Sequence, residues 1–291
     1  MYLLSFLVSG LGIGAVYALA AVGLVLLFRT TGVLNFAFGA AGAVGAFVAF
    51  QFDAMGFGLF LGCSLGIIAS TVTTSLYGRF VAPVLAYRDT VTRSIGTLGF
   101  ALILLGVIGM IWGEVPRRIQ FPTDKMFITV FGVRLTYTRI IALALAAFVV
   151  IALSALIART RLGLNMRALA NNRDHSAMLG IPVLKVEFYA WLIVGVFAGL
   201  CGILMANLVG LKASALTFLV VPAIAAAIMS GMESLPRTAL AGMFLGLAEA
   251  VLSAFPAIAP YRSAAPFLIA LVAVAVMPFL SLPSKRTTNR V

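Results

Sequence analysis

Residues 2–28 read YLLSFLVSGLGIGAVYALAAVGLVLLF, a run of 27 residues that carries no charge. A helix needs about 20 apolar residues to cross the roughly 30 Å hydrocarbon core of a bilayer, so this run predicts a membrane-spanning helix. It has no basic segment before it and no small-residue cleavage site followed by polar sequence. We therefore expect a first span that is kept, and not a signal peptide that is removed.

Eight further apolar runs follow between the charged positions, which predicts nine candidate spans. They are 2–28, 36–52, 57–77, 94–113, 140–158, 186–211, 218–232, 238–255 and 264–280. The runs 36–52 and 218–232 are at or below the usual length limit, which indicates half-helices, broken helices or re-entrant segments. We expect an all-α polytopic membrane bundle of about 8–10 spans that forms a single transmembrane domain over residues 1–291.

The composition supports this fold class. Hydrophobic residues make up 63% of the chain and charged residues only 10%, whereas soluble domains carry about 25% charged residues. A chain with so few charged residues could not cover the surface of a soluble protein with polar groups, which argues against a soluble enzyme. The formal net charge of +12 comes from basic residues that punctuate the apolar runs. It therefore indicates the orientation of loops, because a nucleic-acid-binding protein would gather its basic residues on one polar face.

Basic residues near the ends of the spans favour an N-terminus outside and a C-terminus in the cytoplasm. Thirteen of the 20 lysines and arginines then lie inside, as the positive-inside rule requires. The outer loop, 114–138, contains MFITVFGVRLTY, whose alternation predicts a small β-hairpin. The inner loop, 159–185, predicts a short amphipathic helix at 166–178, stopped by Gly180 and Pro182. Residues 281–291 are expected to form a cytoplasmic tail.

Few residues in the chain offer reactive chemistry. His175 is the only histidine, and Cys63 and Cys201 lie in apolar runs, which argues against a metal centre, a hydrolytic triad or a disulfide framework. The sequence contains no G-x-x-x-x-G-K-[ST] motif, so we expect no ATP bound by a P-loop, no cofactor and no enzymatic activity in this chain.

The spacing of glycines and one acidic residue within the spans also bear on packing and function. Small residues at three- and four-residue spacing within the spans predict close helix packing. Glycine beside asparagine or proline at the short spans, in 31–36 and 221–231, is typical of unwound backbone that binds a ligand. Glu249 is the ionisable residue that we place clearly inside a span. We favour interhelical or interfacial hydrogen bonding for it over a place on a transport path.

Four blocks of sequence share their order and spacing with one known family. They are TGVLNFAFGAAGAVGAFVAF (31–50), SIGTLGF (94–100), MRALANNRDHSAMLGI with FYAWLIVGVFAGLCGIL (166–181 and 188–204), and GMESLPRTALAGMFLGLAEAV (231–251). Together they resemble the LivH-type permeases of branched-chain amino-acid ABC importers. The resemblance implies a permease subunit that moves a branched-chain or other hydrophobic amino acid, or a related small carboxylate, inward.

The resemblance also implies partners and a location. The partners are a second permease subunit, either LivM-like or a second copy, two ATPase subunits that bind the ATP, and a periplasmic or extracellular substrate-binding protein. Membrane lipid surrounds the chain, and nucleic acid is not a partner. The location is the bacterial cytoplasmic (inner) membrane.

The inner loop resembles the coupling helix that docks on the ATPase. The residues implied in coupling are Arg167, Ala168, Ala170, Asn171, Asp174, Ala177, Leu179 and Gly180. The residues implied along the substrate pathway are Asn35, Phe36, Gly39, Thr97 and Gly99.

The sequence departs from the family pattern at two places. Phe38 and Ala40 stand where relatives commonly have histidine and an acid, and Met232, Glu233 and Arg237 stand where they commonly have glycine. A path lined by Phe38 and Ala40 would be more apolar, so the cargo need not be leucine. The alternative function is a stand-alone secondary transporter or facilitator of small organic solutes. The coupling loop favours the ABC permease, because a secondary transporter needs no docking helix.

Overall fold

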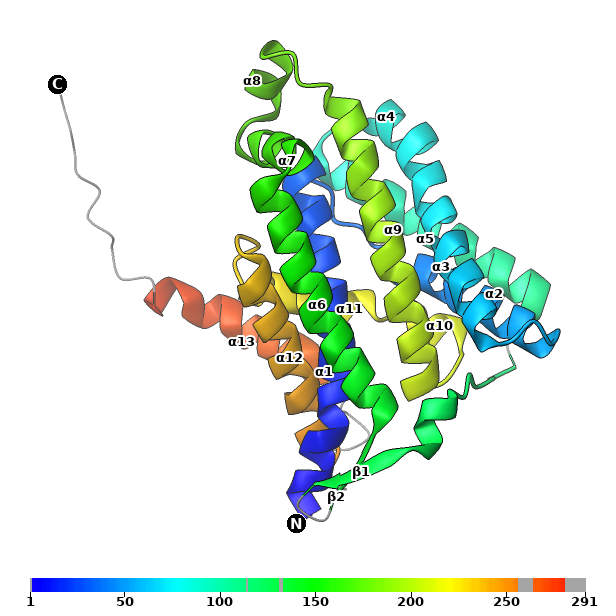
Figure 1. Ribbon diagram of the computed structural model, residues 1–291. Coiled ribbons are helices and arrows are strands. Elements are labelled where there is room, and N and C mark those ends of the chain that lie inside the picture. The colour runs from blue at the N-terminus through cyan, green and yellow to red at the C-terminus, as the bar shows by residue number, and fades with distance from the viewer. Residues whose placement is uncertain (1, 114, 131–132, 256–263, 281–291) are drawn as a thin grey trace.

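The computed structural model describes residues 2–113, 115–130, 133–255 and 264–280 as a helical bundle with a small hairpin at one end (Figure 1). The elements in chain order are α1 (Tyr2–Thr31), α2 (Phe38–Ala54), α3 (Leu59–Leu76), the π-helical turn η1 (Tyr77–Val81), α4 (Ala82–Leu85), α5 (Thr90–Trp112), the 3₁₀ turn η2 (Pro122–Lys125), β1 (Phe127–Val130), β2 (Val133–Thr136), α6 (Tyr137–Arg159), α7 (Arg161–Asn171), α8 (Arg173–Met178), α9 (Val183–Leu208), α10 (Ala213–Thr217), α11 (Val220–Met229), α12 (Leu235–Leu252) and α13 (Ala265–Leu280).

Every predicted apolar run contains a helix, but the helices differ in length. Among the described residues, six helical segments are long and apolar enough to cross a membrane: Ser5–Thr31, Leu59–Leu85, Thr90–Trp112, Tyr137–Arg159, Val183–Leu208 and Leu235–Leu252. As the run lengths predict, α2 has 17 residues and α11 only 10. We did not expect the third span to continue past Tyr77, where η1 and α4 extend it to Leu85.

The helices α1 and α9 form the centre of the bundle. Most of the apolar length of each is buried inside the protein, whereas less than a third of that length is buried in α3, α5 and α6. The exposed side chains on these outer helices include Phe60, Met110 and Phe148. Such surfaces suit lipid and not water, and they confirm a polytopic membrane bundle.

Glycines bring the central helices into backbone contact, as the spacing of small residues predicts. A methyl group added to Gly246 of α12 would lie 2.2 Å from Cα of Gly14 in α1. One added to Gly202 of α9 would lie 2.0 Å from the carbonyl oxygen of Gly42 in α2. Both distances are far below a normal van der Waals contact, so these helix pairs pack at a separation that only glycine permits.

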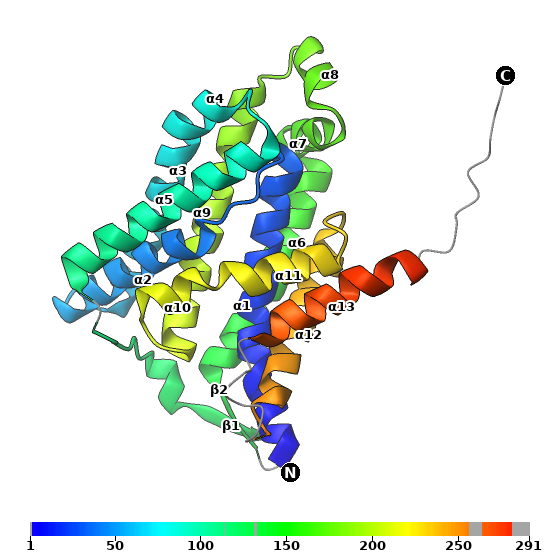
Figure 2. The same ribbon diagram turned by 180° about the vertical axis from the view of Figure 1, so that it is seen from behind.

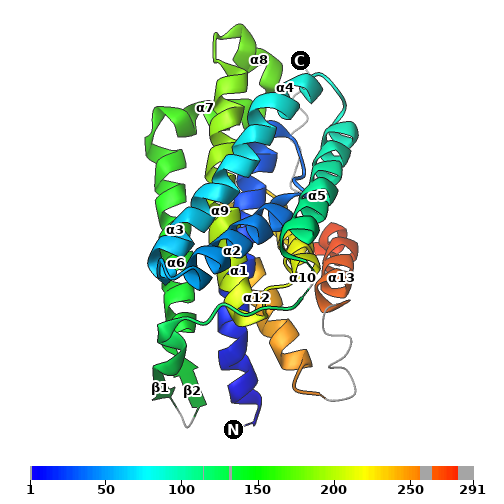
Figure 3. The same cartoon turned by 90° about the vertical axis from the view of Figure 1, so that its right-hand side faces the viewer.

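The hairpin and the inner loop lie at opposite ends of the molecule (Figures 1 and 3). β1 and β2 pair antiparallel, with Phe127 opposite Thr136, beside the N-terminal end of α1. This confirms the predicted hairpin. α7 and α8 lie at the other end, where Arg29 at the end of α1 donates to the carbonyl oxygen of Glu233. The predicted tail, 281–291, lies outside the described residues.

The late helices form a layer on one side of α1 (Figure 2). α10 and α11 are separated by a break at Phe218 and Leu219. The seventh predicted span, 218–232, therefore contains only the short helix α11, one of the outcomes expected from its length. α13 packs against α11 and α12. The break and the surrounding helices line a cavity of about 840 Å³.

Candidate functional site

Two short helices, and not one, form the predicted coupling segment. α7 begins where the Thr160 hydroxyl accepts a 3.1 Å hydrogen bond from the backbone N–H of Gly163. α8 begins at Arg173, directly after its N-cap Asn172, whose backbone is extended and whose side-chain oxygen accepts a 3.0 Å hydrogen bond from the N–H of His175. The prediction of one helix over 166–178 is therefore wrong, because Asn172 acts as an N-cap and interrupts it.

The end of this segment is as predicted. Gly180 adopts a left-handed backbone with φ of 80°, and Pro182 precedes α9. A side chain at position 180 would be strained in this conformation, so glycine allows the chain to turn here.

The residues implied in coupling form an exposed surface at one end of the bundle. Of these residues Ala168 is half-buried, and the others are exposed: Arg167, Ala170, Asn171, Asp174, Ala177, Leu179 and Gly180. The opposite face of the same helices, with Met166, Leu169 and Ser176, is buried. Two apolar side chains next to each other on α8 and its C-terminus, Met178 and Leu179, are 83% and 81% exposed. An apolar tip on a charged loop is typical of a surface that a partner covers.

An ion pair ties this surface to the membrane helices, and the sequence reasoning missed it. Nε of Arg173 in α8 lies 2.9 Å from Oε1 of Glu187 in the first turns of α9. Glu187 is buried, and so is Arg93 at the start of α5, which lies within electrostatic range of Glu187. Glu249 is therefore not the only ionisable residue inside a span. The signal was present in the sequence, since Glu187 interrupts an apolar run.

Hydroxyl groups of α5 hold the extended segment between α1 and α2. The N–H of Leu34 donates to Oγ of Ser94 at 3.2 Å, and the N–H of Phe36 donates to Oγ1 of Thr97 at 3.0 Å. Asn35 is fully buried, and its Oδ1 accepts from the N–H of Ala37. These contacts satisfy backbone groups that would otherwise lack partners in the membrane.

Four of the five predicted pathway residues come together around this segment. Asn35, Phe36 and Thr97 make up the contacts just described, and Gly39 packs against the carbonyl oxygens of Leu216 and Thr217 in α10. Nδ2 of Asn35 has no hydrogen-bond partner among the described residues. Gly99 does not join them, because it lies on the exposed face of α5 with no atom within 4 Å of an added methyl group.

Phe38 and Ala40 line no path in this structure. Both side chains are completely buried in the core, and the Phe38 ring packs against Gly23 of α1. The expectation that they make a transport path more apolar is therefore wrong. The packing of the helices explains the error, since Phe38 in the first turn of α2 faces α1.

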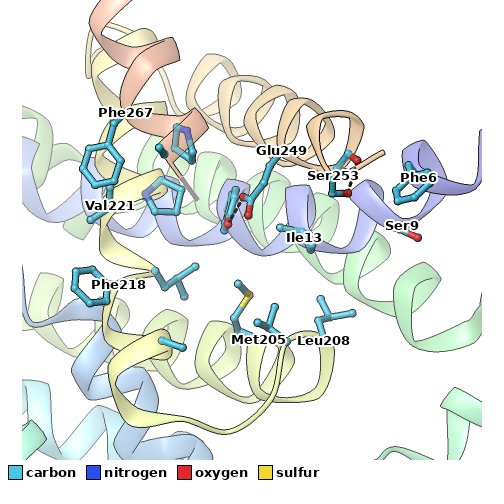
Figure 4. Close-up of a pocket in the computed structure, with 18 of the residues that line it drawn as sticks. Phe6, Ser9, Ile13, Met205, Leu208, Phe218, Val221, Glu249, Ser253 and Phe267 are labelled. Atoms are coloured by element: carbon cyan, nitrogen blue, oxygen red, sulfur yellow. Dashed lines mark hydrogen bonds between the residues drawn. The ribbon is translucent and has the colours of Figure 1, made fainter. Parts of the chain in front are cut away.

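A separate cavity of about 840 Å³ lies among α1, α9, α10, α11, α12 and α13. Its lining includes Tyr17 and Glu249, whose side chains join α1 and α12 by a 2.6 Å hydrogen bond from the Tyr17 hydroxyl to Oε2 of Glu249 (Figure 4). This confirms the interhelical hydrogen bond predicted for Glu249. Val221 and Pro222 also line the cavity, whereas none of the five predicted pathway residues does. The unwound backbone predicted at 221–231 is wrong over most of its length, because Val220–Met229 forms the helix α11 and only the turn after it is not helical.

Comparisons with known proteins agree with this architecture. Residues 6–277 match the family model described as the permease component of branched-chain amino acid transport systems. The high-affinity branched-chain amino acid transport system permease protein LivH of Escherichia coli (strain K12) is 26% identical, over 96% of this chain and 94% of that protein. The corresponding protein BraD of Pseudomonas aeruginosa is 27% identical, over 84% of each chain.

A solved structure shares the fold. PsaBC from Streptococcus pneumoniae in complex with Fab superposes with a TM-score of 0.52 and 16% identity, covering 99% of this chain and 94% of the matched one. At this identity the match shows the fold alone.

Proposed function

Because this chain belongs to the family of permease components of branched-chain amino acid transport systems, we propose that it carries a branched-chain or other hydrophobic amino acid inward across a bacterial cytoplasmic membrane. Separate ATPase subunits supply the energy, and this chain acts as a transport subunit and not as an enzyme. A related small carboxylate is the second class of cargo.

The exposed surface of α7 and α8 is the observation that carries the proposal. Its amphipathic helices keep Met166 and Leu169 buried and present Ala177, Met178 and Leu179 outward. Small residues beside an apolar tip suit insertion into a groove of a partner protein. A stand-alone secondary transporter has no use for such a surface, so the structure favours the ABC permease over this alternative.

The ion pair between Arg173 and Glu187 supports a coupling role. It connects α8, on the docking surface, directly to α9, at the centre of the bundle. A displacement of α8 by a closing ATPase would therefore act on α9 through a buried charge and not only through a loop. Two packings of the bundle, biased by the partner, are what such a mechanism requires.

The proposed assembly contains two permease chains, the second either LivM-like or another copy, two ATPases on the α7 and α8 end, and a substrate-binding protein at the hairpin end. This places the N-terminus outside and the C-terminus in the cytoplasm. The opposite positions of the hairpin and α8 support this orientation.

Replacement of Ala177 by glutamate tests the docking surface. The larger charged side chain projects from the exposed face of α8, and we expect at least about a tenfold loss of ATPase subunits that co-purify with the permease. Ala54→Glu provides the matched control, because Ala54 is equally exposed at the end of α2, beside Asp53 and away from α8. Undiminished co-purification and transport in Ala177→Glu would refute the proposed coupling surface.

A further inference from the structure

Arg93 is a buried cation whose guanidinium makes no hydrogen bond or ion pair with any described residue. It lies in the first turns of α5 and is 8% exposed. Its Nη1 atom lies 3.9 Å from the position of a methyl group added to Gly32, so it reaches the turn that follows α1. The groups that act on its charge are Glu187, Arg173 and Tyr77. The positive end of the α5 dipole further disfavours a cation here, so Arg93 needs a counter-ion.

The carboxylate that acts on Arg93 is already paired. Nε of Arg173 in α8 lies 2.9 Å from Oε1 of Glu187 in α9. Asp89, which is one turn before Arg93 on the chain, accepts two hydrogen bonds from Thr92 at the exposed start of α5. The buried cluster of Arg93, Arg173 and Glu187 therefore contains one more cation than it has anions.

One carboxylate thus serves two cations on different helices. Oε2 of Glu187 accepts no hydrogen bond from the described residues, although a carboxylate can accept about four. Pairing with Arg93 in place of Arg173 changes only which guanidinium has no partner. Arg173 is partly exposed, so water can solvate it when it leaves. Two such discrete arrangements allow a small movement of one element to bias the whole bundle.

We propose that Glu187 exchanges Arg173 for Arg93 during the transport cycle. When a closing ATPase moves α8 away from α9, the carboxylate pairs with Arg93 and draws the start of α5 toward α9. This inference rests on the proposed function, and it extends the coupling from α8 and α9 to α5.

The position of Arg93 on α5 gives the exchange a consequence. Ser94 and Thr97 follow it on the same helix, and their hydroxyls accept the N–H groups of Leu34 and Phe36 in the extended segment between α1 and α2. A movement of the start of α5 would therefore displace this segment, where most of the predicted pathway residues gather. Arg93 is thus a positioning residue that acts on the pathway through Glu187.

The first test measures ATP-driven leucine uptake by the complete transporter in proteoliposomes. Arg93→Gln should lower uptake at least about tenfold, a typical size for the coupling between two sites. It should not lower the midpoint of denaturation, because it removes a buried charge that has no partner in this arrangement. Arg93→Lys keeps the charge and should retain most of the uptake. Arg88→Gln is the matched control, because it neutralises an exposed arginine just before α5.

Two outcomes of this test would overturn the inference. One is uptake by Arg93→Gln equal to that of the control. The other is a loss of uptake that goes with a lower midpoint of denaturation, which a merely structural role would produce.

The second test asks whether Arg93 acts through Glu187. In a Glu187→Gln background the exchange has no carboxylate, so Arg93→Gln should cause no further loss of uptake. A further loss as large as in the wild-type background would show that Arg93 acts through another group, and would overturn the inference.

The third test measures the movement itself. In a Cys63→Ser background, which leaves only the buried Cys201, spin labels on Thr90→Cys and Lys185→Cys would report the distance between the starts of α5 and α9. Both positions are exposed and flank the cluster. Trapping the ATPases with a non-hydrolysable ATP analogue should shorten this distance, and Arg93→Gln should abolish the change. The same change in both proteins would overturn the exchange.

These tests separate the inference from the proposed function. Leucine uptake that Arg93→Gln leaves intact would support the proposed function and overturn the exchange. A nucleotide-driven change of distance that depends on Arg93, in a complex that takes up no amino acid, would support the exchange and contradict the proposed cargo.

Discussion

Because α2 and α9 approach so closely, adding a single methyl group between them should strongly lower the free energy of unfolding. In Gly202→Ala the new methyl group would lie 2.0 Å from the carbonyl oxygen of Gly42 and 2.4 Å from its carbonyl carbon. Non-bonded heavy atoms prefer about 3.5 Å, so the two helices must separate by more than about 1 Å. Overpacking costs about 1–3 kcal/mol, and we expect about 3 kcal/mol here because the obstructing atoms belong to the backbone.

Gly106→Ala on α5 is the matched control for this prediction. No atom lies within 4 Å of the methyl group that it adds, and alanine favours a helix over glycine by about 1 kcal/mol. Reversible unfolding in mixed micelles should therefore show Gly202→Ala to be destabilised and Gly106→Ala to be unchanged or slightly stabilised. If the two variants have the same free energy of unfolding, the close approach of α2 and α9 is refuted.

Other positions give predictions of different kinds. Glu187→Gln should lower the free energy of unfolding by about 1–3 kcal/mol. This loss is smaller than that of a fully buried ion pair because Arg173 is partly exposed. Additive effects in a double-mutant cycle with Arg173→Gln would contradict the ion pair. Met232→Gly should raise the free energy of unfolding by up to about 1 kcal/mol, because Met232 has a φ of 57°, which strains any residue with a side chain. Thermal denaturation would detect this gain, and its absence would argue against backbone strain at Met232. Thr97→Val should cost about 1 kcal/mol because it leaves the partly buried N–H of Phe36 without an acceptor, whereas Thr97→Ser should keep most of the stability. Equal loss in both variants would show that the hydroxyl is not the cause.

The sequence predicts the membrane bundle because the requirements of a membrane span, its length and its apolar composition, can be read directly along the chain. A span must be apolar over a fixed length, so every predicted run contains a helix. The hairpin at residues 127–136 follows from alternation and a central Phe-Gly. The break before His175 is different, because Asn172 is compatible with either a helix interior or an N-cap, and only its extended backbone in the structure decides between them.

The functional residues are less visible in the sequence. Arg93 and Glu187 lie near the ends of apolar runs, where charged residues are expected at the membrane interface, yet the fold buries both. The cavity depends on how α1, α9 and α12 are placed relative to one another, which no local pattern specifies. For the same reason Glu249 could be assigned a hydrogen bond but not the Tyr17 partner that is 232 positions away.

The glycine contacts have a consequence for how the bundle can move. α1 and α12 meet at Gly14 and Gly246, and α2 and α9 meet at Gly42 and Gly202, where backbone lies directly against backbone. Between α1 and α9 the contacts involve side chains of α9, with Phe197 against Gly23 and Cys201 against the carbonyl of Val16. We therefore expect each glycine-joined pair to move as a rigid body and the boundary between them to shear. Spectroscopic distances between α1 and α12 should then stay constant through a transport cycle, while those between α1 and α9 change.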